Sequence, residues 1–80
     1  MRILWFNAAE FVEALENGEV TGEYFLSDLI WNDLIDLVVT DRDIASVISR
    51  NAMVLFLNAR YVEEVKDLVG LAERVLRETD

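Results

Sequence analysis

The sequence predicts a small α/β domain in which helices cover a short, mostly parallel sheet in two or three layers. The prediction depends on short apolar runs rich in branched residues, on amphipathic stretches between them, and on the alternation of the two along the chain. A chain of 80 residues is long enough for one hydrophobic core and too short for two. We therefore expect a single domain over residues 1–80.

The first half of the chain begins with a predicted strand. Residues 2–6 (RILWF) form a bulky apolar run that is typical of a buried strand. Asn7 stands three residues before Glu10, which is the spacing of a capping box, and apolar residues then recur at helical intervals as far as Gly18. After a turn, the spacing of the leucines and isoleucines predicts a second helix over residues 27–35.

The second half is predicted to contain two more strands and two more helices. Residues 36–40 (DLVVT) are short and branched, as expected of a strand. A short helix around residues 44–48 ends at Asn51, and residues 52–57 (AMVLFL) form another apolar run typical of a buried strand. One continuous apolar stripe then predicts a long C-terminal helix over residues 59–77.

An all-α bundle is the alternative fold. It requires residues 36–57 to be helical, and periodicity alone does not distinguish a short apolar run from a buried helix. Val38, Val39 and the run 54–57 favour strands, because branched and aromatic residues are enriched there. The sequence therefore favours the α/β fold.

Composition excludes several kinds of chemistry. The chain has no Cys and no His, so it lacks thiol nucleophiles, the usual proton shuttle at neutral pH and the usual transition-metal ligands. The formal net charge of −9 disfavours a general binder of nucleic acids or anionic membranes. The apolar runs are too short for a membrane-spanning helix, so we expect no membrane association and a cytoplasmic location.

The balance of apolar and acidic residues points to association with other proteins. Hydrophobic residues make up 54% of the chain, which is more than a core of this size buries comfortably. Residues 3–41 carry nine Asp and Glu and no Lys or Arg. We therefore expect a homo-oligomer, a basic protein partner, or both.

Three segments carry a resemblance to a known family. The opening MRIL, the central LVVTDRDI and the later AMVLFLNA, which leads into the last helix, resemble a shortened PIN-like domain, the nuclease fold of many toxin-antitoxin toxins. The resemblance implies that Asp41 and Asp43 hold Mg²⁺ or Mn²⁺ for RNA hydrolysis. Asn7 stands where the family has an Asp, which implies a weakened cation site. Glu10, one turn beyond Asn7, is a further candidate that could supply the missing carboxylate.

Helix capping explains the same acidic residues without a metal. Thr40 can be the N-cap of the short helix, with Asp43 at the capping-box position and Asp41 near the positive end of the helix dipole. Asn7 and Glu10 form a second capping box under this interpretation. The spacing of these residues leaves both interpretations open.

Two residues outside this cluster are candidates for an interface. Trp31 lies in a helix that already has an apolar stripe, and Gly70 interrupts the last helix at a cost of about 1 kcal/mol relative to Ala. The main functional prediction is a protein-interaction module that dimerises or binds a partner and is catalytically degenerate. The alternatives are a Mg²⁺- or Mn²⁺-dependent endoribonuclease, for which RNA would be the partner, and an acidic inhibitor that mimics nucleic acid.

Overall fold

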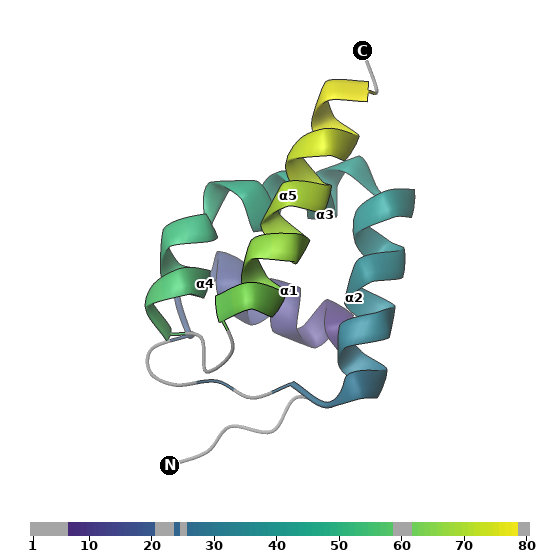
Figure 1. The fold of residues 1–80 in the computed structure, drawn as a ribbon. Helices are drawn as coiled ribbons and strands as arrows, with labels where there is room; N and C mark the ends of the chain where they lie inside the picture. Colours follow the sequence, from purple (N-terminus) through teal and green to yellow (C-terminus); the bar gives the residue numbers. More distant parts are fainter. Residues whose placement is uncertain (1–6, 21–23, 25, 59–61, 79–80) are drawn as a thin grey trace.

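The computed structural model describes residues 7–20, 24, 26–58 and 62–78, and these residues form five helices (Figure 1). About 84% of the described residues are helical, and the described ranges contain no β-strand element. The helices, in chain order, are α1 (Ala8–Glu16), α2 (Asp28–Thr40), α3 (Arg42–Arg50), α4 (Ala52–Asn58) and α5 (Val62–Glu78).

The predicted α/β fold is therefore wrong, and with it the PIN-like fold that the resemblance implied. Residues 36–40 continue α2 to Thr40, and residues 52–57 form most of α4, as the all-α alternative requires. The predicted strand 2–6 lies outside the described residues. Strand propensity differs between residues by only about 1 kcal/mol, so the burial of helical faces outweighs it here.

The beginnings of the first two helices agree with the sequence patterns. Asn7 is the N-cap of α1, and its Oδ1 accepts a hydrogen bond from the Glu10 N–H at 2.8 Å. Ser27 is the N-cap of α2, and its Oγ accepts from the Ile30 N–H at 3.3 Å. Gly18 follows the C-cap residue Asn17 and adopts a positive φ of 72°, a conformation that a side chain would strain. These predicted helix boundaries are confirmed, whereas α2 extends beyond its predicted end.

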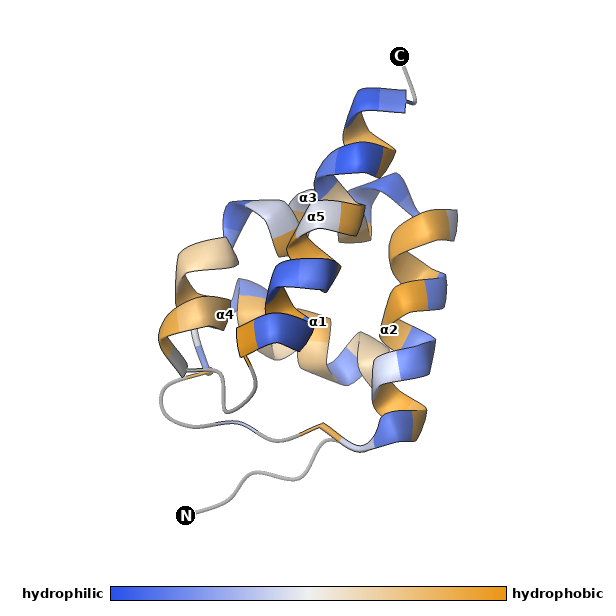
Figure 2. Cartoon of the chain, viewed as in Figure 1, coloured by the Kyte–Doolittle hydropathy of each residue, from blue (hydrophilic) through white to orange (hydrophobic). Residues whose placement is uncertain are grey.

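The hydrophobic core lies among all five helices. Helix α5 packs against α2, α3 and α4, and α1 packs against α2 and α3. Figure 2 shows that α4 is apolar along most of its length, while α5 alternates between polar and apolar residues. The largest side chains that are almost completely buried are those of Phe11, Leu34, Val38, Ile48, Leu55, Val65 and Leu68.

Tyr24 links the segment between α1 and α2 to the core. Its ring lies 5.4 Å from the ring of Phe11, measured between centroids, and its hydroxyl donates a hydrogen bond to the Leu55 carbonyl oxygen at 3.2 Å. Burial raises the pKa of this phenol well above its ordinary value, and the negative charge of Glu64 acts in the same direction. The neutral Tyr24 therefore joins α1 to α4 by packing and by a hydrogen bond.

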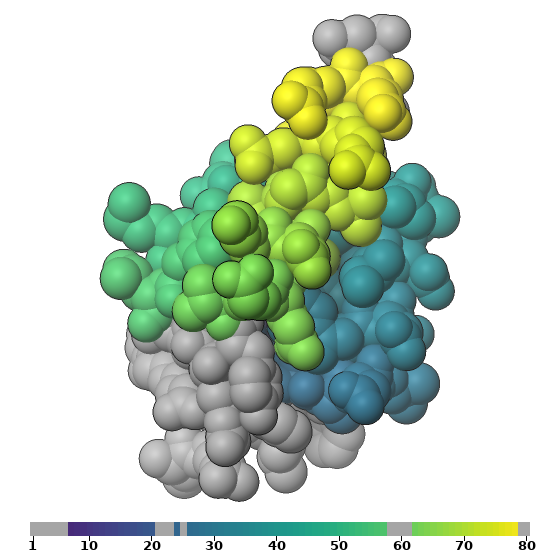
Figure 3. Space-filling model, in the orientation of Figure 1, coloured from purple at the N-terminus to yellow at the C-terminus, as the bar shows by residue number. Residues whose placement is uncertain are grey.

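The last turns of α5 project beyond the other helices (Figure 1). The space-filling view shows the same projection, and it places α5 beside α2 on one face of the molecule (Figure 3). Among the described helices, none combines the length and the apolar content that crossing a bilayer requires.

Candidate functional site

The acidic cluster at residues 41–43 lies at the junction of α2 and α3. Asp41 ends one helix and begins the next: its N–H donates to the Leu37 carbonyl oxygen at 2.8 Å, and its Oδ1 accepts from the Asp43 N–H at 2.9 Å. The predicted N-cap was Thr40, one residue too early, and this prediction is wrong. Thr40 instead donates from Oγ1 to the Asp36 carbonyl oxygen within α2, at 2.7 Å.

The three acidic residues considered as metal ligands do not come together. Within the described residues there is no group of three or more Asp or Glu side chains that could hold a metal ion, so Glu10, Asp41 and Asp43 do not form one. Glu10 lies in the first turn of α1, where its N–H is bonded to Asn7. Binding of Mg²⁺ or Mn²⁺ by Asp41 and Asp43 stays a prediction, without Glu10 as a third carboxylate.

Two substitutions of Asp41 distinguish a helix-capping role of its carboxylate from a metal-binding role. Asp41→Ala is expected to lower the free energy of unfolding by about 1 kcal/mol, because the Asp43 N–H loses its acceptor. Asp41→Asn should change it by only a few tenths of a kcal/mol, because the amide oxygen caps equally well. Urea denaturation of the three proteins measures both differences.

A metal-ligand role for the same carboxylate has a different signature. Mn²⁺ would then broaden the backbone amide signals around residues 41–43 in the parent protein, and Asp41→Asn would abolish this broadening although it preserves the cap. Equal loss of stability in Asp41→Asn and Asp41→Ala would contradict the capping role.

A larger feature is a groove between α2 and α5, with a volume of about 960 Å³. The structure brings Trp31 and Gly70, the two interface candidates from the sequence, to this same groove from helices far apart in the chain. Their participation in an interface stays a prediction. The groove is lined by Asp28, Trp31, Asn32, Ile35, Glu64, Lys66, Asp67, Leu68, Gly70, Leu71, Arg74 and Arg77.

Apolar side chains from both helices line the interior of the groove. Trp31 and Ile35 stand one turn apart on α2, and Leu68 and Leu71 lie on the facing side of α5. Leu68 is buried, Trp31 and Leu71 are half-buried, and Ile35 is 39% exposed. The groove therefore offers an apolar strip that the described part of the chain covers only in part.

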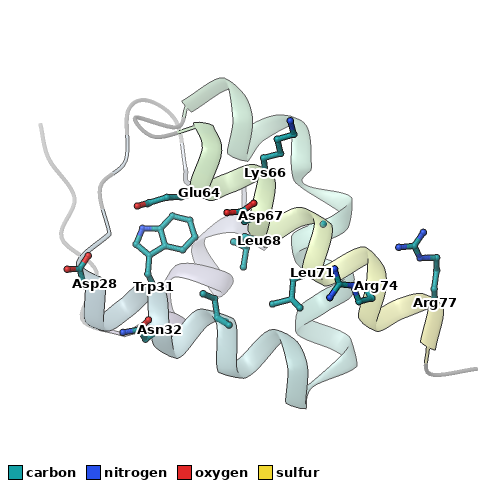
Figure 4. Close-up of a pocket in the computed structure, with 12 residues that line it drawn as sticks. Asp28, Trp31, Asn32, Glu64, Lys66, Asp67, Leu68, Leu71, Arg74 and Arg77 are labelled. Atoms are coloured by element: carbon teal, nitrogen blue, oxygen red, sulfur yellow. The ribbon is translucent and has the colours of Figure 1, made fainter.

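Charges of opposite sign lie at the two ends of the groove (Figure 4). Asp28, Glu64 and Asp67 lie around the Trp31 end, whereas Arg74 and the side chain of Arg77 lie toward the end of α5. The Lys66 side chain points away from Trp31 in this view. A ligand in the groove thus meets acidic side chains at one end and basic side chains at the other.

Gly70 lies on the exposed side of α5, beside the groove. No atom of the described residues outside its own helical surroundings lies within 4 Å of the position that a Cβ would occupy. Packing within the described chain therefore does not require a glycine here, although glycine in a helix costs about 1 kcal/mol relative to Ala.

The sequence pointed to Trp31 and Gly70 but not to the charged ends of the groove. Residues 62–78 carry part of this signal: the early half holds three acids and one Lys, and both Arg residues, Arg74 and Arg77, come in the late half together with Glu73 and Glu78. This division of charge becomes a property of a site only once α2 is known to lie alongside α5.

Comparison with known proteins leaves the function to be argued from the groove itself. No protein family model matches the chain, no curated protein matches it, and no solved structure matches it.

Proposed function

We propose that this protein is a protein-interaction module that binds an amphipathic α-helix in the groove between α2 and α5. The observation that carries the proposal is the combination of an apolar strip with charges of opposite sign at its two ends. Grooves of this kind bind helices whose apolar residues recur every three or four positions.

The dimensions of the groove fit a helix of moderate length. Its lining residues on α5 extend from Glu64 to Arg77, which corresponds to roughly 20 Å of helix, or almost four turns. A bound helix of similar length would contact Trp31, Ile35 and Leu71 with one apolar face. Its ends would lie next to the acidic and the basic ends of the groove.

The charges define the chemistry and the direction of the bound helix. Basic residues of the partner would lie near Asp28, Glu64 and Asp67, and acidic residues would lie near Arg74 and Arg77. The net charge of −9 led us to expect a basic protein partner. The groove narrows this expectation to a partner helix whose basic residues lie in one half only. Such paired charges select one orientation, because the reversed helix places like charges together.

Site-specific cross-linking in cells tests this function. A photoreactive benzoyl-phenylalanine at Asn32, which is exposed and lines the groove, is expected to form covalent adducts with a partner helix. The same group at Glu13, exposed on α1 and absent from the groove lining, is the matched control and should form none.

A second substitution shows whether these adducts depend on the apolar strip. Ile35→Glu places a carboxylate in the strip and should reduce the Asn32 adducts at least tenfold, roughly the effect of 1.4 kcal/mol. Circular dichroism of this variant checks that the helices persist. Adducts that are equally abundant from both positions, or unchanged by Ile35→Glu, would refute the function.

A further inference from the structure

We infer that the helix in the groove is α5 of a second copy of this chain. The two copies form a dimer with two-fold symmetry, in which α5 of one copy runs antiparallel to α5 of the other and crosses it at Gly70. This inference rests on the proposed function, because it identifies the partner of the same groove.

The position of Gly70 provides the first argument. Helix α5 has 17 residues, from Val62 to Glu78, and Gly70 is its middle residue. In an antiparallel pair of identical helices the symmetry axis passes near one residue of each, and that residue meets its own copy. A glycine at this point lets the two backbones approach closely, which accounts for a glycine that packing within the described residues does not require.

The charges that flank Gly70 provide the second argument. Viewed down the axis of α5, with 100° between successive residues, Asp67 and Arg74 lie to one side of Gly70. Lys66 and Glu73 lie to the other side. All four are exposed. Antiparallel pairing places residues of the same side together, so Asp67 meets Arg74 of the second copy and Lys66 meets Glu73 of the second copy. By symmetry each attractive pair occurs twice.

The pattern continues toward the ends of the helix. Glu63 and Arg77 are both exposed, seven residues before and seven after Gly70, and antiparallel pairing brings each near the other residue of the second copy. The basic end of one α5 thereby reaches the acidic end of the other groove, formed by Asp28, Glu64 and Asp67. A parallel arrangement would instead place Glu63 beside Glu63 and Arg77 beside Arg77 of the second copy, so like charges would meet at both ends of the helix pair.

A second copy also meets the geometric requirements of the groove. The last turns of α5 project beyond the bundle, so the second copy can approach them without displacing the other helices (Figures 1 and 3). Ile35 and Leu71 of each copy then cover each other's apolar strips. The net charge of −9 on each copy opposes association at long range, and salt near physiological strength screens this repulsion.

Charge reversal tests the pairing directly. Asp67→Arg and Arg74→Asp each turn two attractive contacts into two repulsive ones, so each variant alone should dimerise at least tenfold more weakly than the parent. An equimolar mixture of the two variants should recover the parent's affinity, because the charges at positions 67 and 74 are again opposite across the mixed pair. Sedimentation velocity at physiological ionic strength, over a series of concentrations, measures all four samples.

Matched substitutions away from the groove control for net charge. Glu13→Arg on α1 and Arg50→Asp on α3 change the charge of the chain by the same two units at exposed positions. Each of these variants should dimerise with the affinity of the parent, and mixing the two should not raise that affinity. A parent that stays monomeric, or a mixture of Asp67→Arg and Arg74→Asp that associates no better than either alone, overturns the inference.

Gly70 offers an independent variant. Gly70→Leu should leave the monomer at least as stable as the parent, because the described residues leave open space there and leucine is the better helix former. It should weaken the dimer at least tenfold, because the side chain separates the helices at the symmetry axis. Unchanged dimerisation of this variant overturns the antiparallel crossing at Gly70.

The cross-linking experiment distinguishes failure of this inference from failure of the proposed function. Adducts from Asn32 whose mass is that of two copies of the chain support the inference. Adducts that contain only other proteins overturn it and leave the interaction module in place, whereas the absence of any adduct overturns both.

Discussion

Leu55→Ala is expected to lower the free energy of unfolding by about 2–5 kcal/mol. Leu55 is 1% exposed and is the most deeply buried of the described α4 side chains, while Ala52, Val54 and Phe56 pack against the core in part. Truncation removes the buried methyl groups and leaves a cavity beneath α4. Because α4 has only seven residues, few other side chains can repack to fill this cavity. Urea denaturation followed by circular dichroism measures the loss.

Leu57→Ala on the same helix is the matched control. Leu57 is 78% exposed, so its truncation should change the free energy of unfolding by no more than about 0.5 kcal/mol. In a strand, residues 55 and 57 would lie on the same face and the two substitutions would cost similar amounts. Equal losses would therefore refute the helical assignment of α4.

The same two residues explain why the sequence did not identify α4. Met53 and Leu57 are 74% and 78% exposed, whereas Leu55 is 1% exposed, so burial follows helical spacing and not strand alternation. The residues that face outward are apolar, and the run AMVLFL contains no polar residue to mark the exposed side. Without such a marker, periodicity cannot separate a helix from a strand.

The end of α2 was missed for a related reason. Val38 is completely buried and its neighbour Val39 is 49% exposed, yet both are branched and apolar. Branching favoured a strand, but the segment contains no proline or glycine that would end the helix before Asp41. The helices that carry charged residues on their exposed sides, α1, α3 and α5, were predicted from the same sequence without this ambiguity.

The candidate sites were predictable to different degrees. Capping is a local interaction, and the sequence located it to within one residue, at Asp41 in place of Thr40. The groove depends on contact between α2 and α5, which lie on opposite sides of the chain's midpoint. Trp31 and Gly70 were recognisable because each is unusual at its own position, but their convergence on one groove required the fold.

Phe11→Ala is the second substitution with a large expected effect, a loss of about 3–5 kcal/mol in the free energy of unfolding. Phe11 is completely buried on α1, and its ring lies 5.4 Å from that of Tyr24. Truncation removes this aromatic contact and opens a cavity between α1 and Tyr24. Because small domains are stable by only about 5–15 kcal/mol, a substantial unfolded population is expected at moderate temperature.

Glu13→Ala is the control for this helix, because Glu13 is exposed and its truncation should change the free energy of unfolding by no more than about 0.5 kcal/mol. Near-ultraviolet circular dichroism adds a second readout, since it reports the fixed packing of the aromatic side chains, among them Tyr24 against Phe11. A Phe11→Ala protein that kept both its denaturation midpoint and this signal would show that α1 is not anchored through Phe11. The contact between α1 and the Tyr24 segment would then contribute little to the fold.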